Sequence, residues 1–162
     1  MYGQYRTGDA CIEYLKKFYD IEGVNVDFFC SLKEYETTYT RESYNMKTYG
    51  EEYSRKQSPL SSDAVAYQTQ QIHKHYNPKK FKIYSTEYEE GLKGIEQSIM
   101  QSKVLAGWAD VIMLKQKYEA DNNMSYDLVI MQRYDVIVWP THAFRTIISS
   151  LIDNPVNERI TF

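Results

Sequence analysis

Two short segments of the chain contain side chains that could hold a phosphorylated ligand. The first is Gly3-Gln4-Tyr5-Arg6-Thr7, directly before a helical pattern. A glycine lets the backbone approach a ligand closely, and the N-terminus of a helix favours anions. Arg6 and Thr7 add side-chain donors for a phosphate or a base. A glycine and an arginine before a helix are also common without any ligand, so an ordinary surface turn is the alternative interpretation.

The second segment is Gln132–Arg133–Tyr134–Asp135, which follows the apolar run Leu128–Met131. Charged side chains that interrupt an apolar strand cost free energy unless they reach solvent, a partner or a metal. Arg133 and Asp135 are two residues apart and therefore point to the same face of an extended chain. An arginine can bind a diphosphate with two hydrogen bonds, and a carboxylate can bind the divalent cation of that diphosphate. A structural ion pair or a polar strand end is the alternative.

Helices and strands must bring these segments together. Apolar residues recur at helical spacing over about 10–19, 63–76, 95–121 and 143–152. Asp9 can cap the first of these helices, and Asn77–Pro78 and Asn122–Asn123 predict the ends of the second and third. Strand patterns cover about 24–31, 81–85 and 126–139, and Leu128–Met131 is typical of a strand that is buried on both faces. Helices that alternate with strands predict an α/β fold, with a mostly parallel sheet and helices on its faces. Ligands bind such sheets beyond the carboxyl ends of the strands.

Three details of the pattern are specific enough to check. Residues 33–60 predict a long tyrosine-rich loop, typical of a lid, a binding loop or a partly disordered segment. The run Lys79–Lys80–Lys82 predicts a solvated strand edge. The apolar face expected for the third helix consists of Ile95, Ile99, Val104, Leu105, Trp108, Ile112 and Met113. The 16 tyrosines suit stacking on sugars or bases, although a compositional bias of the source explains them equally well.

Composition limits the classes of function. The 162 residues predict one domain over 1–162, and a net charge of −3 gives no electrostatic case for nucleic acid. No apolar run is long enough for a membrane span, and the first residues lack the apolar core of a signal peptide. Cys11 and Cys30 lie in apolar patterns and are expected to be buried and reduced. These features together predict a cytoplasmic protein, in the host cytoplasm if the source is a virus.

Over most of its length the chain resembles a family of GT-A-type glycosyltransferase-like proteins of bacteria, phages and large viruses. The segments that carry the resemblance are GQYRTGDACIEYLKKFY, VDFF, KYEADNN and YDLVIMQRYDVIV. In that family a strand runs into a Gly-Gln-x-Arg turn near the nucleotide, and a later segment stands in the place of the metal-binding Asp-x-Asp motif. The resemblance implies a short GT-A or Rossmann-like domain that binds a nucleotide-diphospho-sugar.

The resemblance also assigns roles to individual residues. It implies that Gln4, Arg6 and Thr7 lie near the nucleotide, and that Arg133 and Asp135 lie near the diphosphate and a divalent cation, Mn²⁺ or Mg²⁺. Arg133 stands where many metal-dependent relatives have an aspartate. Either one carboxylate binds the metal, or arginine neutralises the diphosphate in its place.

The chain departs from the family at both ends. Only Met1 and Tyr2 precede the glycine turn, and the chain stops soon after Asp135, where such enzymes continue into the acceptor-binding half. The expected activity is transfer of a sugar to an unidentified glycan, lipid or protein acceptor. The alternatives are a non-catalytic virion component or assembly partner that reuses a truncated transferase fold, a homo-oligomer, and a split enzyme completed by a second chain.

Overall fold

A computed structural model describes residues 1–3, 5, 8–20, 23–39, 55–84, 99–134, 146 and 148–150. Its elements, in chain order, are β1 (Tyr2–Gly3), α1 (Gly8–Tyr19), β2 (Phe29–Lys33), β3 (Tyr35–Tyr39), β4 (Arg55–Pro59), α3 (Ser62–Tyr76), β5 (Lys80–Tyr84) and α5 (Ile99–Asn122). Thr146 and residues 148–150 are also helical. No described helix has the length and apolar character that a membrane span requires.

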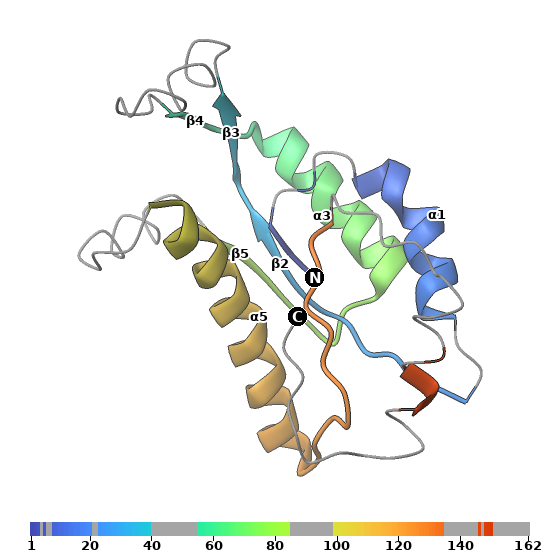
Figure 1. The fold of residues 1–162 in the computed structure, drawn as a ribbon. Helices are drawn as coiled ribbons and strands as arrows, with labels where there is room; N and C mark the ends of the chain where they lie inside the picture. Colours follow the sequence, from blue (N-terminus) through green and yellow to red (C-terminus); the bar gives the residue numbers. More distant parts are fainter. Residues whose placement is uncertain are drawn as a thin grey trace.

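Three parallel strands form a small sheet in the order β1-β2-β5. The helices α1 and α3 lie on one side of this sheet and α5 lies on the other (Figure 1). The mixed α/β class, the parallel sheet and the placement of helices on its two faces are therefore as predicted from the alternation of elements. The first strand is present beside β2, although it is only two residues long.

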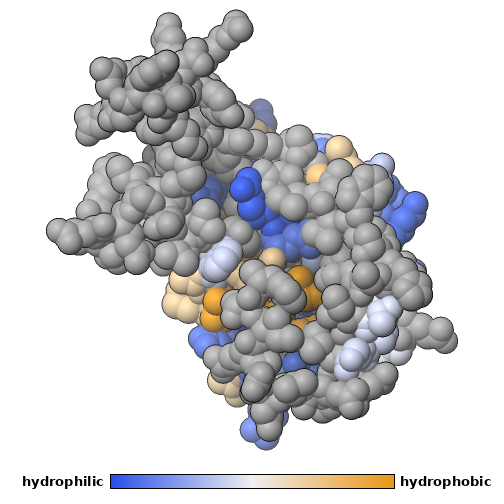
Figure 2. Space-filling view, viewed as in Figure 1, coloured by the Kyte–Doolittle hydropathy of each residue, from blue (hydrophilic) through white to orange (hydrophobic). Residues whose placement is uncertain are grey.

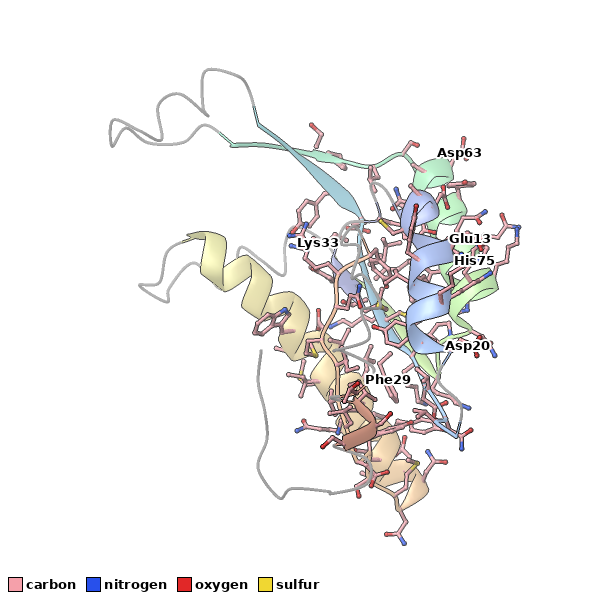
Figure 3. The ribbon with its side chains drawn as sticks, turned by 45° about the vertical axis from the view of Figure 1, so that its right-hand side comes forward. Glu13, Asp20, Phe29, Lys33, Asp63 and His75 are labelled. Atoms are coloured by element: carbon pink, nitrogen blue, oxygen red, sulfur yellow. The ribbon has the colours of Figure 1, made fainter. Side chains whose placement is uncertain are left out.

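The two faces of the sheet differ because side chains alternate along each strand. Cys30 and Leu32 face α1 and α3, where they join the buried cluster that also contains Leu15 and Ile72. Phe29 faces α5, where its ring lies 5.5 Å from the ring of Tyr118 (Figure 3). Burial of one such leucine contributes about 2 kcal/mol. Cys11 and Cys30 are both buried and free, which confirms the sequence-based expectation.

The ends of the helices follow their local sequence. The hydroxyl of Ser61 accepts a hydrogen bond from the Ala64 amide at 3.2 Å and caps α3. That helix ends at Asn77, which adopts a left-handed conformation (φ 41°) before Pro78. Helix α5 ends in the same way, with Asn123 at φ 49°. Both stops were predicted from the sequence.

Residues 33–60 contain two strands, so the prediction of a continuous loop is wrong for this part of the chain. β3 and β4 pair in antiparallel register from Tyr35↔Pro59 to Tyr39↔Arg55. The pair extends from the upper end of β2 in Figure 1. The sequence of β4, RKQSP, has no strand pattern of its own. Its conformation comes from pairing with β3, which a scan for periodicity does not detect.

The second strand and the last strand pattern also required correction. β2 begins at Phe29, and residues 24–28 before it are irregular. Residues 128–130 have no regular secondary structure, and Leu128, Val129 and Ile130 are 37%, 44% and 39% exposed. An apolar run was expected to be buried on both faces, but here it borders a hollow. Residues 135–139 lie outside the described part of the chain.

Two residues of the predicted apolar face of α5 are exposed, and the side chains of four others, Ile95, Ile99, Val104 and Leu105, lie outside the described part. Val111 and Asp110 are buried, while Ile112 and Met113 are 37% and 50% exposed. Apolar residues occur all around this helix, so spacing alone does not select the face that packs. Contacts with the sheet determine which face of α5 is buried, because Lys82 of β5 forms an ion pair with Asp110 at 2.7 Å.

Candidate functional site

The carboxyl end of β1 leads directly into the first helix. The amide of Gly8 donates to the carbonyl of Tyr5 at 3.1 Å and so closes the turn at the start of α1. The Tyr5 ring is 3% exposed, and a side-chain carbon added at Gly8 would overlap it. The glycine is therefore required by the packing of Tyr5 against the helix, which is a structural reason for its position.

Residues 131–134 run alongside β1 and in the same direction (Figure 1). Met131 lines the same hollow as Met1, whereas the ring of Tyr134 lies 5.5 Å from that of Tyr5, beyond the other end of β1. The side chains alternate along this segment. Gln132 and Tyr134 are buried, and Arg133 between them is exposed.

The two segments selected from the sequence are thus neighbours through Tyr5 and Tyr134. Arg133, expected near the diphosphate, is described and faces solvent. The other four site residues predicted from the sequence lie outside the described residues: Gln4, Arg6, Thr7 and Asp135.

Hydrogen bonds hold both segments in place. The hydroxyl of Tyr19, at the end of α1, donates to Oε1 of Gln132 at 2.7 Å. The carboxylate of Asp9 accepts from the hydroxyls of Tyr5 at 3.0 Å and Tyr67 at 2.9 Å. Asp9 was expected to cap α1 from outside, but it lies within the first turn and ties α1 to α3. These bonds make the edge of the sheet a fixed scaffold.

Tyr5, Tyr134 and Cys30 of this scaffold are held in their protonated forms. Burial, supported by the hydrogen bond to Asp9, raises the pKa of Tyr5, and burial also raises the pKa of Tyr134. The pKa of the Cys30 thiol is raised chiefly by burial. Cys30 is therefore no nucleophile, because nucleophilic attack requires the thiolate.

One polar cluster was not identified from the sequence. Asp110 is 1% exposed, its Oδ1 accepts from Lys82, and its Oδ2 has no partner within the described residues. Ser31, the register partner of Lys82, is fully buried. The sequence feature that could have revealed this cluster is Asp110, an aspartate within the apolar run of α5. Lys82 lies on the edge strand β5 with its side chain 40% exposed, as predicted, and its ammonium group also pairs with the buried Asp110.

The described residues contain no group of three or more His, Cys, Asp or Glu side chains that could hold a metal ion. Asp135, the one carboxylate expected to bind a cation, is not among them. The sequence offers two ways to neutralise a diphosphate, a metal bound by Asp135 or the side chain of Arg133. Of these two residues, only Arg133 is described. Comparison of the chain with protein-family models, curated proteins and solved structures gives no match.

Proposed function

We propose that the chain binds a nucleotide-diphospho-sugar at the carboxyl edge of its parallel sheet and transfers the sugar to an acceptor, as a short GT-A or Rossmann-like domain. One observation carries the proposal: the contact between Tyr5 and Tyr134, at 5.5 Å. It joins the turn before α1 to the segment that contains Arg133. Ligands of open parallel sheets bind at this edge, and the N-terminus of α1 favours an anion there.

The proposed chemistry places negative charge on the leaving group. The bond between the anomeric carbon and the diphosphate oxygen breaks, an acceptor oxygen bonds to that carbon, and the acceptor loses its proton. Arg133 would neutralise the diphosphate as it leaves, and stabilisation of that charge is the main contribution expected of the protein. Asp135 with Mn²⁺ or Mg²⁺ would add to this stabilisation. Gln4, Arg6 and Thr7 would contact the nucleotide.

A thermal-shift screen against UDP-, GDP-, CMP- and dTDP-sugars, with and without Mn²⁺, tests the proposal. A donor at about a hundred times its Kd should add roughly 2.7 kcal/mol, which corresponds to roughly 5–10 °C for a domain of this size. Arg133→Ala should abolish the shift. Lys117→Ala is the matched control, since it removes an exposed cation that pairs with its helix neighbour Asp121. A cooperative melt that no donor shifts would contradict the proposal.

A non-catalytic role in assembly is the second candidate. It is favoured by the exposed apolar run Leu128–Ile130 and by the β3–β4 pair that extends from the sheet. Light scattering at micromolar concentration tests it. A stable oligomer in a protein that ignores every donor supports assembly, whereas a monomer that binds a donor contradicts it. A split enzyme would gain activity only when a second chain is added.

A further inference from the structure

A hollow of about 330 Å³ lies at the amino edge of the sheet, opposite the edge proposed above for the nucleotide. Most of its walls come from the irregular residues 23–28 with Phe29 of β2, from the middle of α5 and from residues 126–131, and Met1, Tyr19 and Ile148 complete it. We call it the amino-end pocket. Figure 2 shows apolar residues gathered in the lower half of this face, below a group of hydrophilic ones.

The walls of the amino-end pocket are largely aromatic and aliphatic. Four rings line it, and they pack edge to face in two pairs: Tyr19 with Phe28 at 5.2 Å, and Phe29 with Tyr126 at 5.6 Å. Val111 of α5 lines it as well and is only 3% exposed. Rings fixed by edge-to-face contacts present flat apolar surfaces, which suit a ligand that is itself a ring system.

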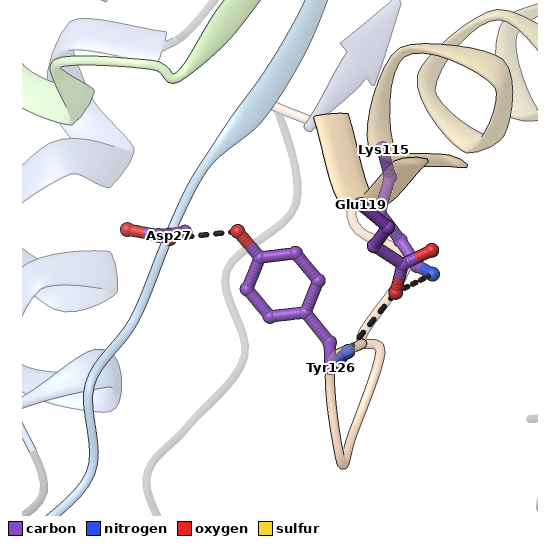
Figure 4. A network of polar contacts seen from close by, with 4 residues as sticks. All are labelled: Asp27, Lys115, Glu119 and Tyr126. Carbon is purple, nitrogen blue, oxygen red and sulfur yellow. Dashed lines mark hydrogen bonds and ion pairs between the residues drawn. The ribbon is translucent and has the colours of Figure 1, made fainter. Parts of the chain in front are cut away.

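Polar contacts join two walls of the pocket through the side chain of Tyr126 (Figure 4). The hydroxyl of Tyr126 donates to Oδ2 of Asp27 at 2.7 Å, and the Tyr126 amide donates to Glu119 at 3.0 Å. Glu119 also pairs with Lys115 at 2.6 Å. Tyr126 therefore bridges α5 and the segment before β2 across the pocket. This bridge opposes collapse of the hollow, so the cavity is a built feature of the fold.

The charges of the inner wall are already balanced. Asp27 is matched by Lys79 at 3.4 Å, and Lys115 is matched by Glu119. Asp127 also lines the pocket, but it is exposed to solvent. A charged ligand would lose its hydration without gaining an unmatched opposite charge, and that loss is costly in an apolar site. The balance favours an uncharged ligand.

The volume sets the size of the ligand. An apolar cavity of about 150 Å³ holds one benzene molecule, so the amino-end pocket has room for about two rings. A carboxylate has about four lone-pair sites, and Asp27 uses its two oxygens for Tyr126 and Lys79. Asp27 can still accept a hydrogen bond from a ligand. We propose that the amino-end pocket binds an uncharged, mainly apolar molecule of about two rings with one hydroxyl or N–H donor.

The probe for this site is 1-aminonaphthalene, which has two rings, is uncharged at pH 7, has an N–H donor, and emits more strongly at short wavelength in apolar surroundings. Titrated into the full chain, it should show a saturable rise with one site per chain. Val111→Trp fills the pocket and should weaken binding at least tenfold. Val26→Trp, in the irregular wall, repeats the test if Val111→Trp does not melt cooperatively. Ile83→Trp is the matched control, since Ile83 lies on the opposite face of the sheet and is 38% exposed.

Competition separates this ligand class from others. 2-Naphthol should displace the probe about tenfold better than 2-methoxynaphthalene, which lacks the donor, and decanoate should not displace it. Unchanged binding in both tryptophan variants would overturn the proposal, as would displacement by decanoate at least as effective as by 2-naphthol. The result is independent of the donor screen, because the two sites lie at opposite edges of the sheet.

Discussion

Both faces of the parallel sheet bury apolar side chains, but only one of them also contains a buried polar pair. Toward α1 and α3, β2 and β5 present Cys30, Leu32 and Phe81, which join one apolar cluster. Toward α5, the same strands present Phe29, Ser31 and Lys82, and Lys82 pairs with the buried Asp110 of the helix. The first face needs only apolar residues of suitable volume. The second face needs particular partners, because a buried polar group without a hydrogen bond destabilises the fold.

This difference predicts that mutations on the two faces behave differently. On the α1 and α3 face, the cost should depend on the volume removed, and no second mutation should recover it. On the α5 face, the stability that is lost when one partner is replaced should be recovered when the other partner is replaced as well.

Leu32→Ala should reduce the free energy of unfolding by about 3–4 kcal/mol, because it leaves a cavity where a fully buried leucine packs between α1 and α3. Urea denaturation measures the change. The matched control is Ile83→Ala, at the register partner of Leu32 on the same face, which is 38% exposed and should cost less than about 1 kcal/mol. Equal costs at the two positions would show that this face is not a packed core.

Lys82→Met should cost about 2–3 kcal/mol, because it leaves the buried Asp110 carboxylate without its counter-charge. The double variant Lys82→Met/Asp110→Leu should recover most of that loss, since an apolar pair suits a buried site. Urea denaturation of both single variants and the double variant completes the thermodynamic cycle. Additive losses would contradict the assignment of Lys82 and Asp110 as a coupled pair.

The same contrast explains what the sequence could predict. Helices α1 and α3 and the end of α5 follow from spacing and from the stop signals at Asn77 and Asn123, which are local. The β3–β4 pair and the buried face of α5 were not predicted, because both depend on partners distant in the chain. The two candidate segments are in contact through Tyr5 and Tyr134, but the predicted last strand forms no ladder at 128–130, so the strand pattern does not explain their proximity. Arg133 is the one predicted site residue within the described part of the chain.

Gly8→Ala tests the carboxyl edge and should cost about 2 kcal/mol. The added carbon would overlap the buried Tyr5 ring, which Tyr134 restrains on another side. Near-UV circular dichroism should change as well, since these tyrosines lose their fixed packing. Gly23→Ala is the control. It should cost about 1 kcal/mol through its positive φ of 79°, with no change in the tyrosine signal, because no atom lies within 4 Å. An unaltered spectrum for Gly8→Ala would contradict the packing described.

Tyr126→Phe tests the amino edge and should have the smallest effect. It keeps the ring against Phe29 but removes the hydroxyl that donates to Asp27, at a cost of about 1 kcal/mol at pH 7. Tyr118→Phe is the matched control, because the Tyr118 ring also packs on Phe29 and only its hydroxyl is lost. Its free energy of unfolding should stay within about 0.5 kcal/mol of the parent value.

The cost of Tyr126→Phe should also depend on pH. Burial, followed by the hydrogen bond to Asp27, raises the pKa of Tyr126 above its usual value of 10. Above pH 10 the unfolded chain therefore loses this proton before the folded chain does, so the parent protein loses stability as pH rises. The phenylalanine variant has no such proton to lose. Urea denaturation at pH 7, 9 and 11 should show the difference between the two proteins narrowing, and a constant difference would mean that this hydroxyl is not buried against Asp27.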